Sequence, residues 1–106
     1  MNAETLKGHL DMLLLSVLER QPAHGYAIAE ALRGRSGQTF DLPEGTLYPA
    51  LHRLERAGLL SSRWSEQRGR RRRVYQLTAK GRRRLAAHHD DWTAFARAVD
   101  AVMGTR

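Results

Sequence analysis

The stretch EQRGRRRRVYQL, residues 66–77, decides the fold, because it sets five arginines within six consecutive residues around Gly69. Before it, residues 60–65 (LSSRWS) alternate between two sets of side chains, and after the arginines Tyr75 and Leu77 stand two positions apart. A period of two is typical of β-strands, and a glycine between two such runs permits the positive φ of a tight turn. The stretch therefore predicts a β-hairpin whose tip carries arginines.

Three helices are expected before this hairpin. Apolar residues at helical spacing predict the first over residues 6–20, and a second is expected over residues 25–35. The third is expected over residues 44–57, with Pro49 in or near its first turn, where a missing N–H costs little, and Gly58 at its end.

A long helix is expected after the hairpin, from the N-cap Thr78 to Gly104. Two apolar series with a spacing of seven interleave on it as the a and d positions of a heptad repeat. Such a seam needs a partner helix, and a second copy of the chain is the simplest one. Met12 and Leu15 lie off the main stripe of the first helix, so they are expected to be exposed beside the seam. The predicted dimer contacts are Leu10, Leu13, Leu85, His88, Trp92, Phe95, Val99 and Val102.

Three helices followed by a hairpin is the order of a winged helix-turn-helix. The predicted fold class is thus mainly α with a small β-hairpin (α+β), divided into a DNA-binding domain over residues 1–78 and a dimerisation helix over residues 79–106. In this fold the third helix enters the major groove of DNA, and the hairpin, which we call the wing (residues 60–77), meets the flanking backbone.

The charge of the chain is concentrated in one segment. The 106 residues carry 18 Lys and Arg against 11 Asp and Glu, a net charge of +7 with neutral histidines. Nine of the basic residues fall within positions 68–84, which hold no acid, while the other 89 residues carry nine basic and 11 acidic side chains. A local excess of this kind is typical of a surface that binds a polyanion.

Several classes of protein are excluded by what the sequence lacks. Without cysteine there is no disulfide, thiolate metal site or cysteine nucleophile, and no other set of catalytic side chains stands out, so we expect neither an enzyme nor a cofactor. Neighbouring residues in HHDD, residues 88–91, diverge on a helix and predict no metal site. The apolar run at residues 12–18 is too short to cross a bilayer. We expect a cytoplasmic, nucleoid-associated protein with no membrane partner.

Three motifs carry a resemblance to a known family. HGY at 24–26, GTLYPALHRLERAGLL at 45–60 and RRRVYQLTAKG at 71–81, with the spacing between them, resemble the PadR family of transcriptional regulators. The resemblance implies a homodimeric repressor that binds double-stranded DNA at a pseudo-palindromic operator. It also implies the short form of the family, in which one long C-terminal helix pairs across the dimer.

The candidate DNA contacts come from the wing and from the family motifs. The wing supplies guanidinium groups that can grip phosphates, and the resemblance implies a role for the start of the third helix and for the tyrosine of HGY. The predicted residues are Tyr26, Thr46, Tyr48, Pro49, His52, Arg53, Arg68, Arg70, Arg71 and Arg72. Core packing remains an alternative for Tyr48, as does helix-start packing for Tyr26 and His24, and the stem of Arg73 is expected to lie against the protein.

Two further questions stay open at this point. The resemblance implies a planar aromatic effector at the dimer centre, in a pocket formed by Met12, Leu15, Trp92 and Phe95, whereas Trp92 as plain interface packing is the alternative. A basic RNA- or ribosome-associated winged-helix module is the alternative to a DNA-binding regulator, and an adaptor whose wing contacts an acidic protein is a third hypothesis.

Overall fold

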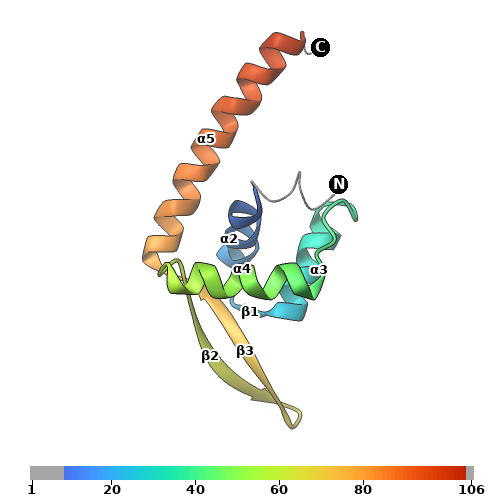
Figure 1. Cartoon of the computed structure of the whole chain (residues 1–106), viewed down its shortest axis with the longest axis vertical. Helices are drawn as coiled ribbons and strands as arrows, with labels where there is room; N and C mark the ends of the chain where they lie inside the picture. Colours follow the sequence, from blue (N-terminus) through green and yellow to red (C-terminus); the bar gives the residue numbers. More distant parts are fainter. Residues whose placement is uncertain (1–8, 105–106) are drawn as a thin grey trace.

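The computed structural model describes residues 9–104 and confirms a winged helix-turn-helix with a long C-terminal helix (Figure 1). The elements are α2 (Leu10–Arg20), β1 (Ala23–His24), α3 (Gly25–Arg35), α4 (Glu44–Arg56), β2 (Leu60–Gln67), β3 (Arg70–Leu77) and α5 (Ala79–Met103). The predicted start of the first helix at Leu6 lies outside the described residues. The wing and α5 project from the helical body in opposite directions (Figure 1).

The wing is a hairpin of two eight-residue strands with an unbroken register. Leu60 pairs with Leu77 at its base and Gln67 with Arg70 at its tip, which leaves Arg68 and Gly69 as a two-residue loop. Both loop residues have positive φ, 52° and 76°, as a type I′ turn requires. Sequence periodicity predicted the hairpin and the role of the glycine, but not the left-handed conformation of Arg68.

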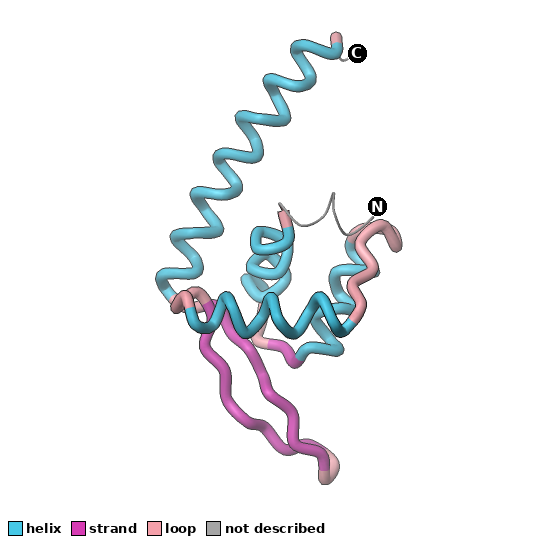
Figure 2. The backbone as a smooth tube through the Cα atoms, in the orientation of Figure 1, coloured by secondary structure: helices cyan, strands magenta, loops and turns pink. Residues whose placement is uncertain are grey.

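A third strand was not predicted. The two residues of β1 pair antiparallel with β3, in the sheet order β1-β3-β2, so the sheet continues from the wing into the helical body (Figure 2). In this pairing His24 lies opposite Val74. Two residues are too few to show a period, so the sequence offered no strand signal here.

The hydrophobic core lies between the three short helices, the base of the wing and the start of α5. Its fully buried members include Leu14, Ile28, Leu51, Leu60 and Tyr75. One prediction about exposure is wrong here. Leu15 is 0% exposed and belongs to the core, because α2 is covered on more than one side by α3, α4, α5 and β3. Leu10 and Leu85, two of the predicted dimer contacts, are each 6% exposed and pack in the core of one protomer, which leaves them little surface for a partner helix.

The junction between α4 and α5 fixes the base of the wing. Gly58, with φ of 80°, ends α4 in a Schellman motif, in which the Leu59 N–H donates to the Leu54 carbonyl at 3.0 Å. The Thr78 hydroxyl donates to the Gly58 carbonyl at 2.7 Å and accepts from the Gly81 N–H at 2.9 Å. One threonine therefore caps α5 and ties it to the end of α4.

Pro49 lies in the second turn of its helix. It is the sixth residue of α4, near the first turn but not in it. Without an N–H, Pro49 cannot donate to the carbonyl of Gly45. The helix begins at Glu44, as expected, and Thr46 and Leu47 both donate their N–H groups to the Pro43 carbonyl, at 3.0 Å each.

The C-terminal helix extends well beyond the helical body. Its 25 residues span about 37 Å, and the chain measures 54 Å along its longest axis. Beyond Leu85 its large apolar side chains are exposed, with Phe95 at 58% and Val102 at 87%. None of the helices between His9 and Gly104 combines the length and apolarity that a bilayer crossing needs.

Candidate nucleic-acid interface

The register of the wing divides its arginines between two faces. Side chains alternate along a strand, so Arg70 and Arg72 share one face, while Arg71 and Arg73 share the other. The cross-strand partners of Arg71 and Arg73 are Glu66 and Trp64. The arginine run therefore has two chemically different sides.

Arg73 is held against the protein, as predicted for its stem. Its Nε donates to the Ser62 hydroxyl at 2.8 Å, and Ser62 in turn donates to the Glu55 carboxylate at 2.5 Å. Arg73 Nη2 also lies 3.6 Å from Glu55 Oε2, and its guanidinium stands 5.3 Å from the Trp64 ring centroid. These contacts fasten the wing to α4. Burial raises the pKa of the neighbouring Tyr75 above its ordinary value, and Glu55 raises it further.

Arg71 and the tip remain more open. Arg71 is exposed and stacks over the Trp64 ring at 4.7 Å, a cation–π contact that orients its stem and leaves its N–H groups available. Arg68 and Arg70 are exposed at the tip and border a solvent-facing hollow together with Gln67 and Arg72. At these exposed positions the guanidinium groups are accessible to an anion.

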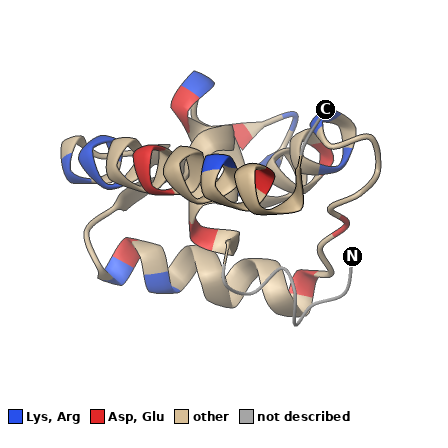
Figure 3. Ribbon diagram, turned by 90° about the horizontal axis from the view of Figure 1, so that it is seen from above, with Lys and Arg blue, Asp and Glu red and all other residues tan. Residues whose placement is uncertain are grey.

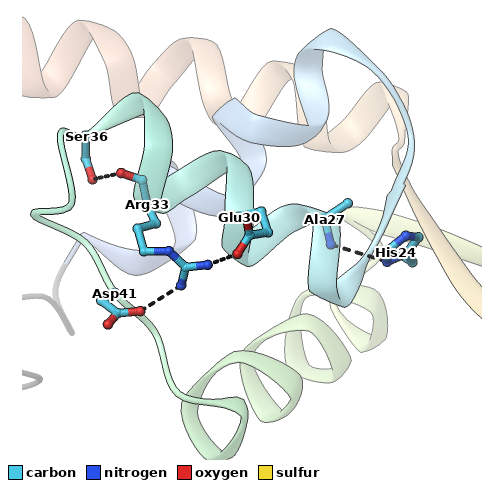
Figure 4. A network of polar contacts seen from close by, with 6 residues as sticks. All are labelled: His24, Ala27, Glu30, Arg33, Ser36 and Asp41. Atoms are coloured by element: carbon cyan, nitrogen blue, oxygen red, sulfur yellow. Dashed lines mark hydrogen bonds and ion pairs between the residues drawn. The ribbon is translucent and has the colours of Figure 1, made fainter.

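Arg72 faces inward, toward the start of α3. Its Nη1 lies 2.8 Å from His24 Nε2 and 3.4 Å from His24 Nδ1. His24 is the N-cap of α3 and accepts the Ala27 N–H on Nδ1 at 3.2 Å (Figure 4). Burial lowers the pKa of His24, and the charge of Arg72 lowers it further. Sequence reasoning treated His24 as a helix-start residue, which it is, but missed its contact with the wing.

The structure brings two of the predicted tyrosines to the same place. A cleft of about 380 Å³ is lined by His24, Gly25, Tyr26, Tyr48 and the arginines at 70–73. Tyr26 is 66% exposed, with its ring stacked on that of His24 at a centroid distance of 6.5 Å. Tyr48 is half-buried against Gly25, where a Cβ atom would collide with its ring. Tyr48 thus both packs and lines the cleft, so the two interpretations of this residue do not exclude each other.

The far end of α3 is fastened independently. The Arg33 guanidinium pairs with Glu30 on its own helix and with Asp41 at 3.0 Å in the following loop (Figure 4). The Phe40 N–H donates to the Ser36 hydroxyl at 2.9 Å. These contacts fix the loop that leads into α4 and therefore the placement of that helix.

The outer surface of α4 carries a stripe of exposed residues at helical spacing. Gly45, Pro49, His52 and Arg56 stand four, three and four positions apart, opposite the buried leucines of the same helix. Two of them, Pro49 and His52, are predicted DNA contacts. Arg56 lies on the same stripe but is not among the predicted contacts.

Two other predicted residues of α4 lie off this stripe. Thr46 is half-buried. Arg53 makes a bidentate ion pair with Asp11 of α2, at 2.7 and 3.0 Å, and the hydrogen bonds that it donates to the Asp11 carboxylate raise the pKa of the guanidinium above its usual range. This pair links α2 to α4, and a contact of the half-exposed Arg53 with DNA stays a prediction.

The basic residues at the start of α5 add to the charge near the junction. Arg82, Arg83 and Arg84 are exposed, and Arg53 and Arg56 occupy the last turn of α4. Viewed from above, these basic groups lie toward the joined ends of the two helices, while acidic residues are scattered along both (Figure 3).

The predicted effector pocket exists only in part. A cleft of about 250 Å³ is lined by His9, Met12, His88, Asp91, Trp92 and Phe95. The His9 and Trp92 rings meet edge to face at 5.2 Å, and the Trp92 and Phe95 ring centroids lie 5.9 Å apart. Leu15 does not line the cleft, because it is buried in the core. A planar aromatic effector at this position stays a prediction. No group of three or more His, Cys, Asp or Glu residues that could hold a metal lies within residues 9–104.

Comparison with known proteins agrees with this geometry. The model of the transcriptional regulator PadR-like family matches residues 14–87. The transcriptional regulator Rv3488 of Mycobacterium tuberculosis is 41% identical over 81 residues, which cover 76% of this chain and 70% of that protein.

Solved structures show the same fold along nearly the whole chain. A PadR family transcription regulator from Clostridium difficile superposes with a TM-score of 0.81 at 34% identity, covering 90% of this chain and 98% of the other. A PadR family regulator from Eggerthella lenta gives a TM-score of 0.83 at 35% identity, covering 97% and 88% of the two chains. The protein therefore belongs to the PadR-like family of transcriptional regulators, whose members are regulators and not enzymes.

Proposed function

We propose that the protein binds duplex DNA as a homodimer, with α4 against base edges in the major groove and the wing against flanking phosphates, and that it represses transcription from a pseudo-palindromic operator. The observation that carries the proposal is the uncompensated charge of the wing. Within the described residues Arg73 is the wing arginine that forms an ion pair with an acid, so the other five guanidinium groups of the wing, at 63, 68, 70, 71 and 72, retain their charge for an anion. The family membership supports a nucleoid-associated protein of the cytoplasm.

The homodimer is supported by the exposed apolar side of α5. Trp92, Phe95 and Val102 present apolar surface that the protomer itself does not cover, and Val99 is half-buried between them. Their spacing is that of a heptad repeat, which is self-complementary when two copies of one helix pair. With Leu10 and Leu85 buried in the core, the proposed seam consists of Leu13, His88, Trp92, Phe95, Val99 and Val102.

The salt dependence of binding tests the proposal. A duplex selected from random sequence by the wild-type protein serves as the probe. If each subunit meets three or four phosphates, the logarithm of affinity should fall against log salt with a slope of about −5 to −7. Arg70→Ala should lower affinity and reduce the magnitude of the slope by about two, one unit for each wing. Arg35→Ala, at the far end of α3, should change neither.

The same titration separates the rival classes. Competition by structured RNA at least as effective as that by the duplex would favour an RNA-associated module. A slope near zero, or equal binding of single strands and duplex, would contradict the proposed function. An adaptor for an acidic protein would leave duplex binding undetected.

A further inference from the structure

His24 stands between two hydrogen-bond donors that it cannot satisfy together. Its Nδ1 accepts the Ala27 N–H, and its Nε2 lies 2.8 Å from Arg72 Nη1. A neutral imidazole has one acceptor nitrogen and one N–H, and a protonated imidazole has no acceptor. When Nδ1 accepts from the helix, the Nε2–H therefore points at another donor. The His24 Nε2–H and the Arg72 N–H then face each other with no acceptor between them.

The groups around His24 supply positive charge and further donors. Arg72 and Val74 of β3 and Arg63 of β2 border it on the side of the sheet, while Tyr26, Tyr48 and the arginines at 70–73 border it in the cleft. Neither hollow is lined by an acidic side chain. Burial and the charge of Arg72 lower the pKa of His24, so the ring is neutral near pH 7 and offers one N–H. An anion with more than one acceptor oxygen would supply the missing acceptor to both groups.

Building on the proposed DNA binding, we propose that His24 and Arg72 together bind one phosphodiester group of the duplex backbone. In the complex His24 Nδ1 keeps the Ala27 N–H, His24 Nε2–H donates to one phosphate oxygen, and Arg72 donates to the same phosphate. Each donor then has an acceptor. The site consists of side chains, because the α3 amide that His24 caps is already occupied. His24 couples the start of α3 to the position of the wing on DNA.

His24→Asn tests this assignment against simple capping. Asparagine is a preferred N-cap and keeps an acceptor for the Ala27 N–H, but its side chain is too short to share a phosphate with Arg72. Loss of a hydrogen bond to a charged group should weaken binding to the selected duplex by about tenfold or more for each subunit. Because a neutral imidazole releases no counterion, the salt slope should stay unchanged, whereas Arg72→Gln should weaken binding and reduce the slope by about two. His89→Asn, an exposed position on α5, is the matched control and should bind as the wild type does.

A neutral phosphate analogue locates the contact. Single methylphosphonate substitutions along the selected duplex should include one position in each half-site at which wild type and His24→Asn bind equally, because the contact is already lost. Equal affinity of the two proteins for the unmodified duplex would overturn the proposal and leave His24 as a cap. If inorganic phosphate shifts the ring signals of His24 while no methylphosphonate removes the difference between the proteins, the site binds free phosphate and the DNA assignment is wrong.

A measurement on the wild-type protein alone covers the case in which the variant does not fold. The ring ¹⁵N resonances of His24 should report a neutral ring protonated on Nε2 before and after the duplex is added, and the Nε2 resonance should shift on binding because its N–H gains a phosphate acceptor. An unchanged spectrum, or a ring protonated on Nδ1, would also overturn the proposal. Absence of duplex binding by the wild type is a different result, since it contradicts the proposed function itself.

Discussion

At the residue scale, neighbouring arginines of the wing make different contacts because alternate side chains of a strand point to opposite faces of the sheet. Arg73 meets Ser62, Glu55 and Trp64 and fastens the wing to α4, whereas Arg72, one position earlier, meets His24 at the start of α3. A run that looks uniform in sequence thus contains one structural guanidinium, one inward-facing donor and three exposed ones. The proposed DNA contacts of the wing depend on this division.

The lowered pKa of His24 makes folding dependent on pH. In the unfolded chain this side chain titrates near 6.5, and in the folded protein its pKa is lower, so as pH falls the unfolded state takes up the proton first. The contribution to stability is therefore fully present above about pH 6.5 and is lost as pH falls through the folded pKa. Urea unfolding from about pH 8 to pH 5 should show the free energy of unfolding of wild type falling relative to that of His24→Asn. Parallel curves for the two proteins would contradict the assignment of this titration to His24.

At the element scale, the junction of α4 and α5 fixes the base of the wing. Gly81 lies against the Leu59 carbonyl, and a Cβ atom there would collide with that backbone oxygen and with the Leu77 side chain. Gly81→Ala should therefore lower the free energy of unfolding by about 1–3 kcal/mol, although alanine is the better helix former. Gly34→Ala in α3, where a Cβ atom meets nothing within 4 Å, is the control and should raise stability by up to about 1 kcal/mol. Equal effects in urea unfolding would show that the junction tolerates a side chain.

The sequence predicted elements whose ends carry their own signals. Gly58 and Thr78 are local caps, so the end of α4 and the start of α5 were correct to within a residue, and the turn at Gly69 set the hairpin register. Contacts between residues far apart in the chain have no such local signal in the sequence. The bidentate pair of Arg53 with Asp11 joins residues 42 positions apart, and the burial of Leu15 depends on how four elements surround α2. The contact of His24 with Arg72 depends on the pairing of β1 with β3, and β1 is too short to be recognised in the sequence.

At the scale of the whole molecule, the chain is divided between a closed core and an open apolar side. Leu85 marks the boundary on α5, because it is buried in the core while Trp92, Phe95 and Val102 beyond it are exposed. A second copy that covers this side would also set two wings and two α4 helices at a fixed distance, as a two-fold operator requires. Dimerisation and the spacing of the DNA half-sites would then depend on the same residues.

Phe95→Glu should separate the protomers without unfolding them. Phe95 is 58% exposed in the protomer, so a carboxylate there meets water in the monomer and an apolar seam in the dimer, where its burial costs several kcal/mol. Sedimentation should show a folded monomer at concentrations that keep the wild type dimeric, and the salt slope of DNA binding should fall to about half. Arg97→Gln changes the charge by the same amount about 200° around the helix and should stay dimeric. Leu85→Glu should instead unfold the protein, so a folded Leu85→Glu variant or a dimeric Phe95→Glu variant would place the boundary between core and seam elsewhere.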